Sequence, residues 1–253
     1  MPDTDKPRYP SLDGRTVLVT GGSTGIGAAI VEAFVGQNAR VGFLDIDAAG
    51  AEALVARLDG KPVFRACDLT DLDAATSAIQ ELQEALGAFR VLVNNAGNDE
   101  RHATADVTPD YWDRVMALNL KHQFFCAQAV QPGMKAAGGG SIINLSSIAW
   151  MFGAPRLVAY AAAKAATVGM THTLAREWGP DRIRVNAIAP GAVITERQRR
   201  LWYSDAQVAE IVARQCLPGI LEADAIADIA LFLASDESRM LTKQCITVDA
   251  GLR

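Results

Sequence analysis

A tyrosine and a lysine stand four residues apart, in the stretch Tyr160-Ala161-Ala162-Ala163-Lys164. On a helix, this spacing places both side chains on one face. A nearby ammonium favours the phenolate form of a tyrosine and lowers its pKa, so the pair predicts a group that exchanges a proton with an alcohol near neutral pH. The same spacing is also typical of an exposed helix face, so the surroundings decide between the two interpretations.

Two apolar runs end in polar residues that belong with this pair. One run ends in Asn144-Leu145-Ser146-Ser147, thirteen residues before Tyr160, and another ends in Asn94-Asn95-Ala96-Gly97. Ligands of open parallel sheets bind at the carboxyl ends of the strands, where the Ser147 hydroxyl could hold a reacting oxygen. Gly97 would allow a cofactor to approach the backbone closely.

A glycine-rich segment, Thr20-Gly21-Gly22-Ser23-Thr24-Gly25-Ile26-Gly27, lies between an apolar run and a helical pattern. Its glycines permit a tight turn and close approach to a pyrophosphate, and the helix start offers free N–H groups and partial positive charge. A lone glycine cluster would be a plain turn as readily, but this placement favours a dinucleotide-binding loop. The expected cofactor contacts here are Gly21, Ser23, Thr24, Gly25, Ile26 and Gly27.

Asp45 ends the next apolar run, eighteen residues beyond Gly27, at the spacing at which an acid meets the adenosine ribose. A 2′-phosphate beside this carboxylate would cost about 1–4 kcal/mol, which favours NAD over NADP by tens-fold or more. Ile46 stands where an NADP site would place an arginine. The alternative is that Asp45 merely caps the helix starting near Asp47. We expect NAD, with contacts to Asp45 and Ile46.

The elements that must position these residues follow from hydrophobic patterning. Seven strands are predicted, at Thr16–Thr20, Arg40–Asp45, Val63–Ala66, Val91–Asn94, Ser141–Leu145, Arg184–Ala189 and Cys245–Val248. Crossover helices are predicted at Ala28–Gln37, Asp73–Leu86, Tyr111–Ala137 and Val158–Trp178. This alternation predicts a Rossmann-type, doubly wound α/β fold, with a seven-stranded, mostly parallel sheet and helices on both faces.

The chain of 253 residues predicts one domain over residues 11–253, after an N-terminal tail of residues 1–10. The connection at about 192–218 has the least strand-like pattern, and we expect it to be a substrate loop. The net charge of −5 gives no reason to expect nucleic acid or an anionic membrane as a partner, which favours a small molecule.

No apolar run is long enough to span a bilayer, and the first ten residues lack a secretory pattern, so we expect a cytoplasmic protein. The four cysteines form no CxxC pair, which favours free thiols in a reducing compartment. The three histidines show no metal-ligand spacing, so no metal is expected.

Together, these motifs resemble those of the short-chain dehydrogenase/reductase superfamily over nearly the whole chain. Gly21, Gly25 and Gly27 match its TGxxxGxG, and Asn94 to Gly97 match its NNAG. Asp68 matches its adenine-contacting acid, and Pro190-Gly191 with Thr195 match a PGxxxT segment that contacts the nicotinamide amide. The resemblance implies further cofactor contacts from Asp68, Leu69, Asn95, Ala96, Gly97, Tyr160, Lys164, Pro190, Gly191, Val193 and Thr195.

The resemblance also implies four catalytic residues. Ser147 would orient a substrate hydroxyl, and Tyr160 would remove its proton as hydride passes to nicotinamide C4. Lys164 would hydrogen-bond the nicotinamide ribose, and Asn119 would hold a water that links the lysine to solvent.

Polar and aromatic residues flank the predicted pocket. Asn98-Asp99-Glu100-Arg101-His102 follows the NNAG turn, and Tyr203 follows Trp202. Such a lining suits a polyhydroxylated ligand, because unpaired hydroxyl groups are costly and aromatic faces pack against sugar rings. The expected substrate contacts are Asn98, Ser147, Trp150, Arg156, Tyr160, Gln198 and Trp202. The alternative for any one of them is a solvated loop.

The NNAGNDERH segment, Trp202-Tyr203, Ile211–Leu217 and the ending Val248-Asp249-Ala250-Gly251 resemble bacterial D-xylose-like aldose 1-dehydrogenases. The resemblance implies oxidation of the anomeric hydroxyl of a cyclic sugar to the lactone with NAD. D-xylose, L-arabinose, D-galactose, L-fucose and a ketodeoxy sugar acid remain open as substrates. It also implies a homotetramer.

Two other functions remain open. A 3-oxoacyl carrier-protein reductase shares every catalytic residue, and the basic run Arg197, Arg199 and Arg200 could dock an acidic carrier or simply be a solvated helix face. Asp45 argues against this function, because such reductases usually need NADPH. A non-catalytic NAD-binding regulator would be expected to have a broken catalytic set, whereas this set is complete.

Overall fold

The computed structural model describes residues 7–253, which form one seven-stranded sheet in the order β3-β2-β1-β4-β5-β6-β7. The strands are β1 (Thr16–Thr20), β2 (Arg40–Asp45), β3 (Val63–Ala66), β4 (Val91–Asn94), β5 (Gly140–Leu145), β6 (Ile183–Pro190) and β7 (Cys245–Val248). All six neighbouring pairs run parallel. The predicted doubly wound α/β fold is confirmed.

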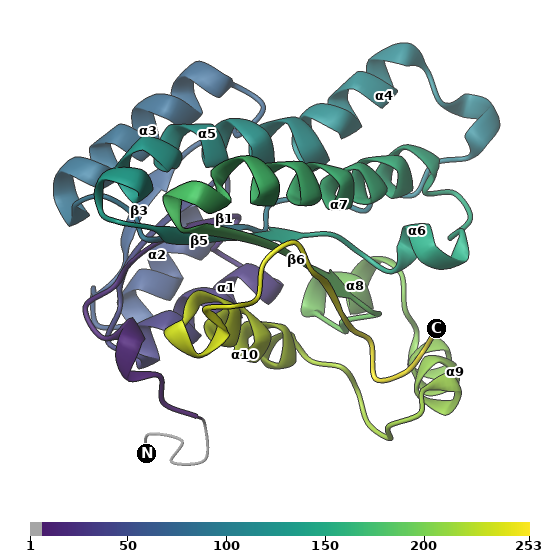
Figure 1. The fold of residues 1–253 in the computed structure, drawn as a ribbon. Helices are drawn as coiled ribbons and strands as arrows, with labels where there is room; N and C mark the ends of the chain where they lie inside the picture. Colours follow the sequence, from purple (N-terminus) through teal and green to yellow (C-terminus); the bar gives the residue numbers. More distant parts are fainter. Residues whose placement is uncertain (1–6) are drawn as a thin grey trace.

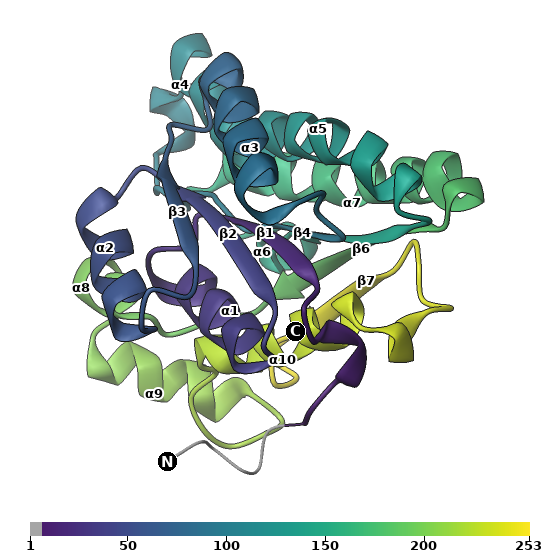
Figure 2. The ribbon, with the colours of Figure 1, turned by 90° about the vertical axis from the view of Figure 1, so that its left-hand side faces the viewer.

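Helices cover both faces of the sheet (Figures 1 and 2). One face carries α3 (Leu72–Leu86), α4 (Pro109–Met116), α5 (His122–Ala136) and α7 (Val158–Trp178), and the other carries α1 (Gly25–Gly36), α2 (Ala48–Arg57) and α10 (Ala223–Ala234). Three short helices, α6 (Ala149–Phe152), α8 (Glu196–Leu201) and α9 (Asp205–Arg214), lie beyond the carboxyl ends of β5 and β6. Single turns complete the chain at η1 (Pro10–Leu12), η2 (Thr104–Asp106), η3 (Ala117–Lys121), η4 (Gly179–Asp181) and η5 (Asp236–Ser238).

The sheet separates two hydrophobic clusters because successive strand residues point to opposite faces. Val17 and Val19 pack with Phe34 of α1 on one face, whereas Leu18 packs with Leu82 of α3 on the other. These side chains are completely buried, and each such burial contributes roughly 1.5–3 kcal/mol. The rigid sheet therefore fixes where its strand ends lie.

Two helical segments differ from the prediction. The expected helix Tyr111–Ala137 is divided, because η3 is a π-helical turn between α4 and α5. The expected loop at 192–218 contains α8 and α9, which are capped by the side chains of Thr195 and Ser204. A capping side chain satisfies N–H groups that a short helix would otherwise leave free.

The expected tail of residues 1–10 lies partly outside the described residues. From residue 7 onward the chain is attached to the domain: the Pro7 carbonyl accepts a hydrogen bond from Gln37 Nε2 at 3.0 Å, and the Tyr9 amide donates to Gln37 Oε1 at 2.9 Å. The described part of the domain therefore starts before residue 11.

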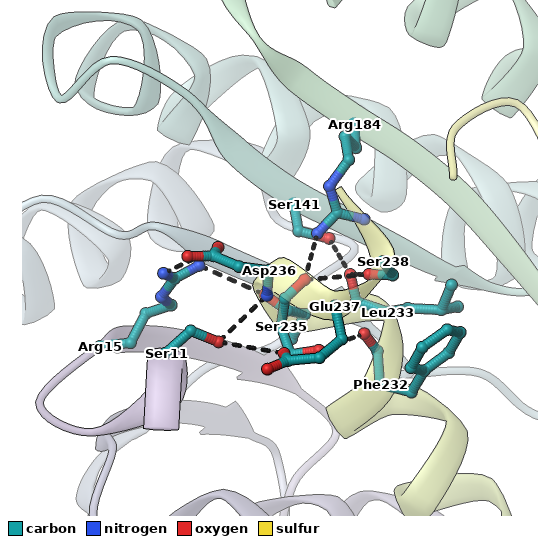
Figure 3. A network of polar contacts seen from close by, with 11 residues as sticks. Ser11, Arg15, Ser141, Arg184, Phe232, Leu233, Ser235, Asp236, Glu237 and Ser238 are labelled. Atoms are coloured by element: carbon teal, nitrogen blue, oxygen red, sulfur yellow. Dashed lines mark hydrogen bonds and ion pairs between the residues drawn. The ribbon is translucent and has the colours of Figure 1, made fainter. Parts of the chain in front are cut away.

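A polar network joins the end of α10 to the amino ends of three strands (Figure 3). Arg15, which precedes β1, contacts Asp236 at 3.1 Å, and Ser141 of β5 donates to the Leu233 carbonyl at 2.8 Å. Arg184 of β6 donates to the Ser235 carbonyl at 3.1 Å. These contacts stabilise the amino ends of the strands, which lie at the opposite end of the sheet from the predicted site.

Candidate active site

The glycine loop lies directly against the turn that follows β4. A β-carbon at Gly27 would lie 1.8 Å from the Gly21 carbonyl oxygen, so no side chain fits there. Asn95 Nδ2 donates to that same oxygen at 2.7 Å, and Thr20 Oγ1 accepts from the Asn95 and Ala96 amides at 3.1 and 3.2 Å. Two segments that were predicted separately to bind the cofactor therefore form one surface.

This surface fits a dinucleotide diphosphate. No side chain of the described residues caps the start of α1, and its first turn contains no acidic residue, so its amide groups and partial positive charge are available to an anion. The Ser23 hydroxyl is buried and has no partner among residues 7–253. Thr195 closes the other side, since its methyl group lies 3.3 Å from where a β-carbon of Gly25 would be.

Asp45 also supports the glycine loop. Its Oδ2 accepts the Ser23 amide at 2.9 Å and its Oδ1 accepts the Asp47 amide at 3.0 Å. The cap of α2 is Asp47, which accepts the Gly50 amide, so Asp45 is not the residue that caps this helix. Ile46 projects into solvent. The Asp45 carboxylate thus stands at the carboxyl end of β2 and contacts the glycine loop that follows β1.

The remaining predicted cofactor residues continue this surface. Asp68 is exposed after β3, and its Oδ1 accepts the Thr70 amide at 2.9 Å, while Leu69 is buried behind it. Pro190 ends β6, and the Gly191 amide donates to the Val248 carbonyl at 2.8 Å. Val193 is buried in the core cluster beneath.

Asn119 is brought to the site by the π-helical turn. Its Oδ1 accepts the Asn98 amide at 2.9 Å, and its Nδ2 donates to the carbonyls of Asn98 and Val115 at 3.2 and 3.1 Å. A π-helical turn adds a residue to a helix and is frequent at functional sites, because it directs a side chain that regular helix would place elsewhere. The helical pattern in the sequence does not reveal this turn.

The other three predicted catalytic residues converge near Asn119. A β-carbon at Gly97 would lie 2.8 Å from Asn119 Oδ1 and 3.3 Å from Lys164 Nζ. Lys164 is buried and donates to the Leu145 carbonyl at 2.9 Å. The Ser147 hydroxyl lies near the Tyr160 phenol, whose pKa it lowers.

The protonation chemistry of the tyrosine differs from the prediction. Burial raises the pKa of Tyr160, the Asp99 carboxylate raises it further, and the hydrogen bond from Ser147 opposes both. Burial lowers the pKa of Lys164 to about 8. The expected lowering of the Tyr160 pKa by Lys164 was wrong for the chain without its cofactor. The reason is that burial, the largest cause of the shift, raises the pKa of Tyr160, while Lys164 donates to the Leu145 carbonyl.

Asp99 and Arg197 are site residues that the sequence did not identify. Asp99 accepts hydrogen bonds from Arg197 at 2.7 Å and from Gln198 Nε2 at 2.8 Å, and Arg197 also donates to Asn98 Oδ1 at 2.7 Å. Asp99 stands in the polar segment after the NNAG turn, but its partners lie almost one hundred residues away along the chain. Only the composition of that segment could have pointed to it.

The predicted substrate residues are not all brought together. Asn98 and Gln198 are linked through Arg197 and Asp99, which also contact each other. Ser147 lies next to Tyr160. Trp202 follows α8, with the Arg101 guanidinium 4.9 Å from its ring centre. Trp150 uses its indole N–H within the chain, on Ser146 Oγ at 3.2 Å.

Arg156 is exposed. It adopts a left-handed backbone with φ of 63°, and its carbonyl accepts the His102 amide at 2.8 Å. The structure therefore places its backbone, rather than its guanidinium, in the loop that borders the site.

The basic run on α8 is largely engaged within the chain. Arg197 pairs with Asp99, and Arg199 pairs with Asp205 at 3.0 Å. These pairs leave little of the run for an acidic partner.

Within residues 7–253, no cluster of three or more metal-ligating side chains is present, and no helix is both long and apolar enough to cross a membrane.

Comparisons with known proteins agree with this geometry. A family model described as enoyl-(acyl carrier protein) reductase matches residues 21–253. The chain is 49% identical to "Probable galactose dehydrogenase GalD" of Rhizobium meliloti (strain 1021), with 97% of each chain covered. It is also 49% identical to D-xylose 1-dehydrogenase of Caulobacter vibrioides (strain NA1000 / CB15N), with 97% of this chain and 98% of that one covered.

A solved structure gives a similar result. The 3-oxoacyl-[acyl-carrier protein] reductase of Brucella melitensis with bound NAD superposes with a TM-score of 0.86 at 38% identity, covering 96% of this chain and 93% of that one.

Proposed function

The chain belongs to the short-chain dehydrogenase/reductase family, and from this premise we propose that it oxidises the anomeric hydroxyl of an aldose to the lactone with NAD. The observation that carries the proposal is the convergence of Asn119, Lys164, Tyr160 and Ser147 beside the glycine loop. The two sugar dehydrogenases are more similar to the chain than the carrier-protein reductase is, at 49% against 38% identity. D-xylose and D-galactose are therefore the first substrates to test.

The residues suggest a division of tasks. The Ser147 hydroxyl holds the reacting oxygen of the sugar next to Tyr160. The Tyr160 phenol first gives up its own proton along Lys164 and Asn119, and the resulting phenolate accepts the proton of the sugar hydroxyl as a general base. NAD, when bound, supplies the acceptor for the hydride that leaves the anomeric carbon. Lys164 and Asn119 lie behind the phenol and provide the route by which its proton reaches solvent.

NAD is proposed in preference to NADP because Asp45 supplies negative charge at the end of β2, and Ile46 next to it supplies no compensating cation. A 2′-phosphate there would meet repulsion of about 1–4 kcal/mol. We propose the cytoplasm as the site of action, in keeping with a small-molecule reaction that consumes NAD.

We also propose a homotetramer. The face formed by α4, η3, α5 and α7 exposes Trp112 and Phe125, each with 37% of its surface accessible, beside an apolar groove. The groove is lined mainly by apolar side chains, including Met116, Leu120, Phe124, Phe125 and Met170, together with the charged residues Asp113, Arg114 and Lys121. Contiguous apolar surface of this kind marks an interaction site.

The test is an NAD-reduction assay with the purified enzyme over D-xylose, D-galactose, L-arabinose, L-fucose, sugar acids, simple secondary alcohols and a 3-oxoacyl thioester. Formation of NADH with neutral aldoses, together with a lactone product identified by NMR, is expected. Activity confined to the thioester with NADPH would show that the chain is a carrier-protein reductase. Activity confined to sugar acids would keep the reaction class and overturn the substrate.

A further inference from the structure

The contact between Asp99 and Gln198 determines which end of an amide faces the substrate. A carboxylate can only accept hydrogen bonds, so the amide nitrogen of Gln198 must be the atom that faces Asp99 Oδ2, at 2.8 Å. Arg197 occupies the other carboxylate oxygen at 2.7 Å and keeps it from turning. Gln198 Oε1 is thereby directed away from Asp99, and it is buried without a partner among the described residues.

The indole N–H of Trp202, one helical turn beyond Gln198, is a buried hydrogen-bond donor. The Trp202 amide donates to the Gln198 carbonyl at 2.9 Å, so the two side chains leave the helix on neighbouring positions. The Trp202 indole nitrogen is also buried without a partner among residues 7–253. A buried donor and a buried acceptor, each costly when unpaired, are both satisfied by a single hydroxyl group.

This pair belongs to the substrate side of the site. Asp99 follows Asn98, whose amide is held by Asn119, and the charge of Asp99 acts on both Tyr160 and Lys164. Tyr203, next to Trp202, likewise acts on Tyr160. Gln198 is thus linked through Asp99, Arg197 and Asn98 to Asn119 of the catalytic set.

We propose that Gln198 and Trp202 together bind one substrate hydroxyl remote from the anomeric carbon, with Gln198 as acceptor and Trp202 as donor. Asp99 is the positioning residue that orients the Gln198 amide. This inference rests on the proposed oxidation of an aldose and names the determinant of its specificity. It selects a neutral sugar, because a carboxylate at this position would bring its oxygens against Gln198 Oε1 with no proton between them.

The test compares each monodeoxy form of the best aldose with the parent sugar, for the wild type and for Gln198→Ala and Trp202→Phe. In the wild type, removal of the bound hydroxyl is expected to lower kcat/KM about tenfold, the effect of one lost hydrogen bond. In either variant the parent sugar should lose a similar factor, while removal of that same hydroxyl should have little further effect. Removal of any other hydroxyl should lower kcat/KM by the same factor in all three proteins.

Arg200→Ala is the matched control, because this side chain is exposed on the same helix. It should leave the whole deoxy series unchanged. The dissociation constant for NADH, measured by fluorescence, should be equal in all variants if each retains its fold. The deoxy series on the wild type and on Trp202→Phe keeps the test decisive if Gln198→Ala fails to fold.

Asp99→Asn tests the positioning role. An asparagine can present either its oxygen or its nitrogen, so the Gln198 amide loses its fixed orientation. We expect KM for the parent sugar to rise about tenfold with a smaller change in kcat, and the preference for the one hydroxyl to disappear. A variant that was merely destabilised would lose activity while keeping the deoxy pattern of the wild type.

The outcomes separate this inference from the proposed function. Suppose that the wild type oxidises neutral aldoses, but that each variant loses as much kcat/KM as the wild type does on removal of every hydroxyl. The inference is then wrong, and the proposed function stands. If the wild type oxidises no neutral aldose, the proposed function fails. If it then oxidises sugar acids and Arg101→Gln abolishes this activity, the bound group is a carboxylate held by Arg101, whose Nε has no partner among residues 7–253. Both the inference and the proposed substrate are then overturned.

Discussion

At the scale of single residues, burial shifts the pKa values of Tyr160 and Lys164 more than neighbouring charges do. The sequence predicted the identity of Tyr160 and Lys164 because their spacing is local, but it predicted the wrong direction for the tyrosine pKa. The enclosure of Tyr160 and the nearby Asp99 carboxylate come from distant segments, which no local pattern contains.

Replacing Tyr160 with phenylalanine removes the general base and keeps the ring. Turnover of the aldose should fall by roughly 10²–10⁴, the usual contribution of general acid–base catalysis. Binding of NADH should remain measurable by fluorescence titration. Near-normal turnover in this variant would show that another group accepts the proton.

Asp45→Ala should relax the choice of cofactor. Loss of the carboxylate removes the repulsion of a 2′-phosphate, so the ratio of kcat/KM for NAD over NADP should fall by tens-fold. Because Asp45 also holds the Ser23 and Asp47 amides, the thermal midpoint should be recorded as a control. An unchanged preference for NAD would contradict the assignment of this residue.

His122 should make the protein sensitive to acid. Burial, together with the charge of Lys164, lowers its pKa from an ordinary value of 6.5 to about 4. Between these values the unfolded chain binds the proton and the folded chain does not, so stability falls as the pH drops from about 6.5 to 4.

The loss attributable to His122 should be on the order of 3 kcal/mol at the acid end. It is measured from urea unfolding of the wild type and His122→Gln across this range. A pH dependence that is identical in the two proteins would show that His122 does not titrate in this way.

At the scale of elements, the sequence predicted the strands well because continuous apolar runs end at glycines and polar turns. It predicted the helices less completely. The π-helical turn at Ala117–Lys121 has the same composition as regular helix, so only packing reveals it. Of the two helices within 192–218, α8 has only six residues, whereas the start of α9 was readable from the capping box of Ser204 and Gln207.

The β1–α1 turn offers a sharp test of element geometry. Gly27→Ala would place a methyl group 1.8 Å from the Gly21 carbonyl, so the turn must shift and NADH binding should be lost. Gly36→Ala is the matched control at the other end of α1, where the added methyl meets nothing within 4 Å. It should leave binding intact and stabilise the helix by roughly 0.5–1 kcal/mol. Tight NADH binding by Gly27→Ala would show that the turn is not the diphosphate site.

At the scale of the whole molecule, the parallel sheet brings the carboxyl ends of its strands to one edge, where the site lies. The polar network around Arg15, Ser141 and Arg184 stabilises the opposite edge (Figure 3). This separation lets the loops at the functional edge vary without disturbing the strands. Contacts within these loops, such as that of Asp99 with Gln198, decide which sugar binds. Sequence patterns do not show such contacts.

The assembly should depend on the exposed apolar face of α4 and α5. Light scattering coupled to gel filtration should give about four times the 26.9 kDa chain mass for the wild type. Phe125→Glu should shift the enzyme to a smaller species, because a charge cannot be buried unpaired in an apolar contact. A wild-type monomer would remove the tetramer from the description.

The Asp99–Gln198 contact also has a consequence for how the family diversifies. An apolar residue at position 198 would leave one oxygen of Asp99 unpaired, and an apolar residue at position 99 would free the amide to rotate. Neither position can be altered alone without a penalty. Descendants that acquire a new sugar should therefore carry coordinated replacements at both positions, and laboratory evolution that randomises them jointly should reach new preferences that single-site libraries miss.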